Sequence, residues 1–266
     1  MNNTDNGNKP MKVLATVPSK LPLHLAHPPL AEAIFELRFK PTQPAVAQLL
    51  PGIIYAKLGG KYGRSEALPF ASIPLQIRVQ MSEKDSNLLY QAEYRLSEEG
   101  ASVFVGERVA GVSMTAPYEG WHHFRPRILE FLEILRSSGL VEKVERFSIK
   151  ATNIIPATGV QLDLLNLRAE IGGISAPEKG FRFRTEINDK TLNRIIEVST
   201  NATVQFHSGE TTSGLLLSLD CVRPVENEDY WSIHEKALDE VYRELKELFF
   251  GLITQEGLES LGPSYE

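Results

Sequence analysis

Three polar residues in the second half of the chain have side chains that could form a hydrolytic site. His207, Asp220 and His234 belong to the residue types that act as general acids and bases, and Asp220 follows an apolar run at 214–219. Their spacing matches no catalytic motif, and His234 heads an apolar stripe, which favours a packing role. They are weak catalytic candidates for the alternative function, a hydrolase or nuclease-like enzyme with a dispersed site.

Two pairs of histidines invite comparison with metal sites. His122 and His123 are adjacent, and successive helical side chains point about 100° apart, so both cannot reach one ion. His24 and His27 precede two prolines that favour extended backbone, and no cysteine or acid cluster stands beside them. The sequence therefore predicts no metal site, and no motif in it indicates a cofactor.

Arginines alternate with apolar residues in several strand-like segments. In Phe-Arg-Phe-Arg (181–184) the two residue types must point to opposite faces of a strand. The non-core face of a sheet would then carry Arg78, Arg146, Lys150, Arg182 and Arg184. One interpretation is a solvated face; the other is a platform for an anionic partner such as a nucleic acid, a nucleotide or an acidic protein. A protein partner, including a second copy of the chain, also stays open.

Composition and charge limit the class of protein. The 266 residues carry a net charge of −6, with 42% hydrophobic and 23% charged residues, which is an ordinary globular balance. The single cysteine, Cys221, fits a reducing compartment. The first residues lack the apolar run of a signal peptide, and no stretch approaches the roughly 18 residues that span a bilayer. We expect a cytoplasmic protein that does not engage a membrane.

Hydrophobic periodicity predicts the elements that must position these residues. In the first part of the chain, strands are expected at 31–39, 74–81, 88–97 and 102–114, with a helix at 44–60. A helix from 121 to about 136 follows, then a strand at 141–155 and a short helix at 162–173. Strands at 181–188, 194–207 and 214–224 lead to a last helix at about 230–254.

This order of elements occurs twice, as strand, helix, three or four strands and helix. We predict an α+β fold in which an antiparallel sheet carries long helices on one face, with two pseudo-repeats and a TATA-box-binding-protein-like or helix-grip-like topology. Residues 1–20 are expected to form a disordered tail and 257–266 a flexible C-terminus. The two halves, 21–141 and 142–256, would form one compact unit.

The stretch Tyr-Glu-Gly-Trp-His-His-Phe (118–124) opens the first long helix. Trp121, Phe124 and Ile128 step by three and four, so they share one helix face. Pro126 lacks the N–H that would bond the carbonyl of His122, so the regular helix should begin near Phe124 or be kinked there. We interpret the stretch as the seat of the helix on the sheet.

Four segments, HPPLAEAIFELRF, PYEGWHHFRPRI, ERFSIKATNII and GLLLSLDC, resemble an uncharacterised bacterial protein family scattered sporadically among genomes. The family pattern is matched by Pro28, Pro29, Glu32, Ala33, Phe35, Glu36, Pro117, Tyr118, Gly120, Trp121, Phe124, Arg146 and Asn153. The chain departs from it at Ala151 and Thr152, where the family tends to have an aromatic residue, which puts a stacking role of that strand in doubt.

The resemblance implies no established activity. The sporadic distribution of the family is the basis for expecting a role in a mobile bacterial defence or stress module. We interpret the motif residues Glu32, Phe35, Tyr118, Gly120, Trp121, Phe124 and Asn153 as structural. Since no catalytic set emerges, the sequence favours a non-enzymatic binding or interaction protein of unknown ligand.

Overall fold

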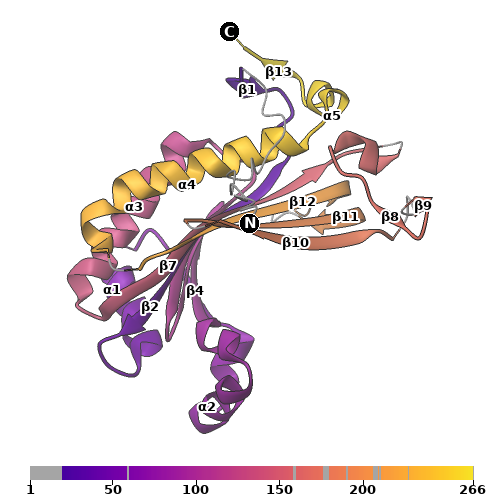
Figure 1. Ribbon diagram of the computed structural model, residues 1–266. Helices are drawn as coiled ribbons and strands as arrows, with labels where there is room; N and C mark the ends of the chain where they lie inside the picture. The colour runs from indigo at the N-terminus through magenta and orange to yellow at the C-terminus, as the bar shows by residue number, and fades with distance from the viewer. Residues whose placement is uncertain are drawn as a thin grey trace, which may run out of the picture.

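The chain folds around one antiparallel sheet of nine strands with long helices packed on it (Figure 1). The computed structural model describes residues 20–58, 60–157, 160–175, 180–189, 191–205, 209, 211–226 and 228–265. In spatial order the strands are β10 (Arg182–Asn188), β11 (Asn193–Gln205), β12 (Thr211–Pro224), β7 (Val141–Ile155), β2 (Leu30–Pro41), β6 (Val109–Thr115), β5 (Ala101–Gly106), β4 (Ala92–Glu98) and β3 (Arg64–Ala67). The predicted α+β class is confirmed.

The two halves of the chain meet at the centre of the sheet, where β2 pairs with β7. Outward from this seam the first half runs β2, β6, β5, β4 and the second runs β7, β12, β11, β10. In each half the last of these strands along the chain leads into a long helix, α3 (Trp121–Ser138) or α4 (Tyr230–Leu252). The two halves therefore share this order of strands outward from the seam, although only the first has an α-helix after its first strand.

Alternation along the central strands decides which face carries the helices. Phe35, Leu37 and Phe39 of β2 are fully buried, and so is Phe147 of β7, whereas the residues between them are partly exposed. The buried face is covered by α3, α4 and the shorter α1 (Val46–Lys57). Packing amphipathic helices on one face of a sheet buries the apolar surface of the sheet and that of the helices.

Helix α3 begins at Trp121, where the apolar stripe predicts it, and not near Phe124. Gly120, at a φ of 97°, turns the chain sharply, and its carbonyl oxygen accepts hydrogen bonds from the amides of His123 and Phe124. Regular helix therefore starts at Trp121, and Pro126 lies inside it. At the other end, Gly139 closes the helix in the left-handed region with a φ of 67°.

The prediction of a strand at 74–81 is wrong, because these residues form α2 (Leu75–Lys84). Two 3₁₀ helices, η1 (Pro69–Ser72) and η2 (Ser86–Tyr90), flank α2, which extends away from the sheet beside β4 (Figure 1). The strand expected at 102–114 is instead the hairpin of β5 and β6, with its turn at Glu107 and Arg108.

Other departures lie at the chain's loops and end. The short helix expected at 162–173 is a 3₁₀ turn, η3 (Gln161–Leu164), followed by the small hairpin β8 (Glu170–Ile171) and β9 (Ile174–Ser175). The predicted flexible C-terminus forms α5 (Gln255–Ser260) and β13 (Pro263–Ser264), which pairs with β1 (His24–Leu25). The predicted tail at 1–20 lies outside the described residues except for Lys20.

None of the helices in the described part of the chain is both long and apolar enough to cross a membrane.

Cys221 on β12 is fully buried, and burial raises the pKa of its thiol to about 12. At neutral pH the thiol is therefore protonated and unreactive.

Candidate functional site

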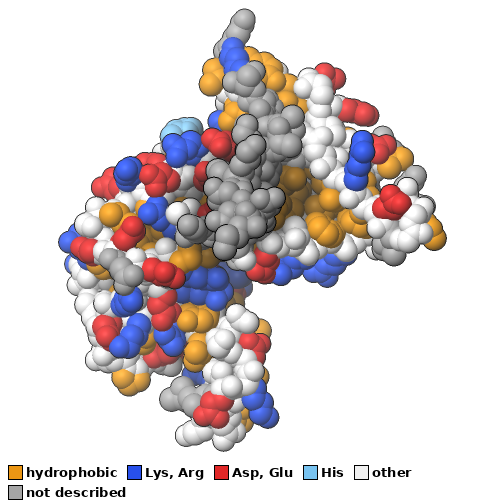
Figure 2. Space-filling model, in the orientation of Figure 1, with side chains coloured by type: hydrophobic (Ala, Val, Ile, Leu, Met, Phe, Trp, Pro, Cys, Tyr) orange, Lys and Arg blue, Asp and Glu red, His pale blue; other side chains and the backbone are white. Residues whose placement is uncertain are grey.

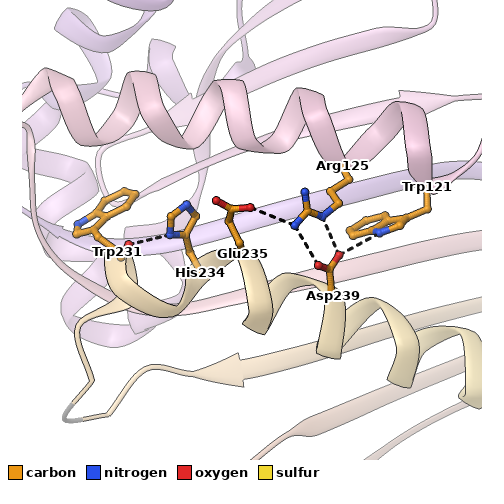
Figure 3. Close-up of polar contacts among 6 residues, drawn as sticks. All are labelled: Trp121, Arg125, Trp231, His234, Glu235 and Asp239. Atoms are coloured by element: carbon orange, nitrogen blue, oxygen red, sulfur yellow. Dashed lines mark hydrogen bonds and ion pairs between the residues drawn. The ribbon is translucent and has the colours of Figure 1, made fainter.

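The predicted catalytic residues are not brought together. Asp220 lies between Leu219 and Cys221, which are fully buried on the helix-bearing face of β12, so its side chain points to the opposite face. His234 is on α4, on the helix side, where its Nδ1 lies 2.9 Å from the carbonyl oxygen of Trp231 (Figure 3). Its ring packs near those of Tyr230 and Trp231. His207 lies outside the described residues.

The predicted cationic face is largely neutralised by carboxylates. Arg182 bonds Glu197 at 2.7 Å, Arg184 bonds Glu186 at 2.7 Å, and Arg146 lies 3.5 Å from Glu36. Lys150 stands opposite Asp220 in the β7–β12 register. Figure 2 shows Lys and Arg side chains interspersed with acidic ones around the hollow between the sheet and α2, rather than as an unbroken cationic surface.

Arg78 does not belong to this sheet face, because the segment that carries it is helical. From α2 its guanidinium forms an ion pair with Glu93 of β4 and lies 5.6 Å over the ring of Phe70. The carboxylate of Glu93 is almost fully buried. Arg78 therefore anchors α2 to the sheet instead of facing a partner.

Both histidine pairs lie at exposed positions. His24, His27, His122 and His123 are all exposed, and His123 is 3.6 Å from Glu119. Throughout the residues that the structure describes, no three metal-ligating side chains cluster.

A cavity of about 770 Å³ lies between the helix-bearing face of the sheet and the elements over it. Its floor is formed by Ala33 of β2 with Ile149, Ala151 and Asn153 of β7. Because Ala33 and Ala151 are direct cross-strand neighbours, two of the smallest side chains face the interior at the same point. No large side chain therefore fills the floor at this point.

The walls and roof come from three separate segments. The start of α3 provides one wall, and the C-terminal half of α4 provides the other. The roof is the segment 22–30, which is hydrogen-bonded to residues 261–264 through the amides of Leu23, Ala26 and His27. The principal apolar lining residues are Leu25, Leu30, Tyr118, Trp121, Phe124, Tyr242, Leu245, Phe249 and Phe250.

Trp121 is held against α4 rather than against the sheet. Its ring stacks on Tyr242 with centroids 4.0 Å apart and planes 3° apart, and its Nε1 donates to Asp239 at 3.3 Å. Arg125 donates to the same carboxylate through Nε at 2.8 Å and through a second nitrogen at 3.0 Å, and it also bonds Glu235 (Figure 3). These contacts join the start of α3 to α4 and fix the width of the cavity.

Removing the contacts of Arg125 with Asp239 and Glu235 should weaken the attachment of α3 to α4 without changing the hydrophobic core. We expect Arg125→Met to lower the free energy of unfolding by about 1 kcal/mol, because a partly exposed bidentate pair is screened by solvent. Thermal melts at low and high salt measure this, and the difference from wild type should shrink at high salt. Arg136→Met, on the same helix but with no ion pair among the described residues, is the matched control. Equal losses of unfolding free energy in the two variants would contradict a stabilising role for the Arg125 contacts.

Asn153 places an amide at the floor of an otherwise apolar space. It is only 4% exposed, and its Nδ2 donates to the carbonyl oxygen of Leu217 at 3.1 Å. This bond fixes the orientation of the amide, so the carbonyl oxygen Oδ1 remains as an acceptor for a ligand. Burial raises the pKa of the Tyr118 and Tyr242 phenols, so both stay neutral.

A second, smaller cavity of about 210 Å³ lies between β11, β12 and α4. Two of its three arginines are already bonded: Arg194 to Asp189 and Glu244, and Arg223 to Glu228 and Glu240. Asp189 has a pKa held well below its ordinary value by Arg194 and by the backbone amides of Thr191 and Leu192, although burial opposes this. The ion pairs that line this cavity join α4 to the sheet.

Five residues that the sequence marks as structural motif positions converge on the large cavity: Tyr118, Gly120, Trp121, Phe124 and Asn153. Glu32 and Phe35 do not line it; Glu32 is on the opposite face of β2, and Phe35 is fully buried in the core. The sequence reveals the motifs but not their convergence, because the cavity joins segments that lie more than 200 residues apart. No protein-family model matches the chain, and no curated protein is significantly similar to it.

Proposed function

We propose that this chain is a non-enzymatic binding protein whose ligand is a small molecule with a largely apolar body, held in the 770 Å³ cavity. The observation that carries the proposal is the composition of that cavity. Apolar and aromatic side chains form most of its surface, and one oriented amide, Asn153, lies at its floor. Cavities of this size and composition are typical of sites for small organic ligands.

Catalysis is the weaker alternative because its candidates are dispersed. Asp220 and His234 are on opposite sides of the sheet, and neither lines the cavity. We also propose that the protein acts in the cytoplasm, in keeping with the buried, protonated thiol of Cys221.

Filling the cavity tests the proposal directly. We expect Ala151→Phe to weaken binding of the neutral dye Nile red by at least about tenfold, because the new ring would occupy the floor where the ligand lies. Dye fluorescence titrations measure the affinity. Thermal melts should show a folded variant, since the ring enters existing space rather than a packed core.

Thr152→Phe is the matched control, since the adjacent residue on β7 points to the opposite face of the sheet. It should bind the dye as wild type does. A folded Ala151→Phe variant that retains full binding, or a wild-type protein that binds no dye, would overturn the proposal.

A further inference from the structure

Lys246 is the cation on the wall of the large cavity. It lies on α4 four residues after Tyr242 and three before Phe249, so the three side chains share one face of the helix. Lys246 is half-buried, and its aliphatic stem can follow the apolar wall while the ammonium stays at the mouth. This arrangement puts a positive charge where an apolar ligand would end.

Most cations on neighbouring elements are already neutralised, but Lys246 is not. Lys236 on the same helix faces Glu240, and Arg125 and Arg223 are bound by carboxylates. Within the described ranges, Lys246 has no carboxylate within ion-pair distance. An unpaired, half-buried ammonium beside a cavity can form an ion pair with an anionic group of a ligand.

Glu119 is the other ionised residue on the lining. Its carboxylate is more than half exposed and lies 3.6 Å from Nδ1 of His123. His24 and His122 also line the mouth, and both are exposed. Lys246 is therefore the lining residue with which an anionic group of a ligand can pair.

We propose that the ligand is an amphipathic monocarboxylate, such as a fatty acid, whose carboxylate bonds the ammonium of Lys246 and whose chain lies over Ala151 and against Trp121. The inference rests on the proposed function and adds the chemical class of the ligand. The single positive charge of Lys246 matches the single negative charge of a monocarboxylate. The stacked rings of Trp121 and Tyr242 provide a flat apolar surface for the chain.

The protein carries its own reporter for the test. Of the two tryptophans, Trp121 lines the cavity and Trp231 does not, so Trp231→Phe leaves fluorescence that reports on the cavity. In this background we would titrate dodecanoate and dodecan-1-ol, which differ in the head group. We expect dodecanoate to bind about tenfold more tightly, which is the effect of one partly buried charged hydrogen bond.

Lys246→Met should remove this preference by weakening dodecanoate about tenfold while leaving dodecan-1-ol unchanged. Lys236→Met, which changes an exposed lysine of the same helix, should alter neither affinity. Equal binding of the two probes, or a preference that survives Lys246→Met, would overturn the carboxylate inference and leave the proposed function standing. If neither probe binds and Nile red does not bind either, the proposed function itself fails.

Discussion

Replacing Gly111 by alanine is expected to lower the free energy of unfolding by about 3 kcal/mol. Gly111 is in β6, opposite Glu36 of β2 and Phe104 of β5. A Cβ added there would overlap the carbonyl oxygen of Phe35 and the ring of Phe104. The first is backbone in the centre of the sheet and cannot move without breaking strand pairing.

The aromatic ring explains why the site requires glycine. Phe104 lies across the place that a side chain at Gly111 would take, so the ring covers bare backbone. Gly52→Ala in α1 is the matched control, because nothing lies within 4 Å of the added Cβ. In a helix interior the same change should raise stability by about 0.5 to 1 kcal/mol. Urea denaturation measures both; a Gly111→Ala variant as stable as wild type would contradict the close approach.

Asp220→Asn is expected to stabilise the protein at pH 8 by about 2 kcal/mol. Burial raises the pKa of the Asp220 carboxyl from 3.8 to about 6. The nearby charge of Glu36 adds to this, and a hydrogen bond from Ser148 with the charges of Lys150 and Arg146 partly opposes it. Its Oδ1 is buried without a hydrogen-bond partner, so the ionised form is poorly solvated.

The sign of the pH dependence follows from this raised pKa. Between pH 4 and pH 6 the folded protein holds a proton on Asp220 that the unfolded chain releases, so wild-type stability rises as pH falls through this window. Asparagine carries no charge, and thermal melts of Asp220→Asn should lose this part of the pH dependence. Asp239 has its pKa lowered by Arg125, so Asp239→Asn should instead destabilise at pH 8. Parallel wild-type and Asp220→Asn curves would refute the assignment.

Sequence periodicity correctly predicts the elements that place their apolar side chains on one face, toward the core. The stripes of α3 and α4 and the alternation of β2 and β7 face one buried interior, so the pattern and the structure agree. In α2 the apolar residues recur every second position, at 75, 77, 79 and 81, which is typical of a strand. There the ion pair of Arg78 with Glu93, a contact across the fold, holds a helix that extends from the sheet.

The site could be predicted only in fragments. Residues 22–30, 118–124, 149–153 and 242–250 meet through the sheet order and the β1–β13 pairing, and neither can be read from local patterns. Besides the motif residues, a sequence signal is the presence of Ala33 and Ala151 at inward positions of strands that also carry Phe35 and Phe147. Their significance depends on β2 and β7 being neighbours, because each alanine alone is an ordinary core residue.

The arginines of β10 also bear on how the molecule avoids aggregation. β10 forms one end of the sheet, and an open strand edge can capture a strand of another molecule. Along β10 the exposed side chains are Arg182, Arg184, Glu186 and Asn188, and the strand at the opposite end, β3, has only four residues. Charged side chains at one end and a short strand at the other make both edges poor templates, so the nine-stranded sheet is protected from growing by strand addition.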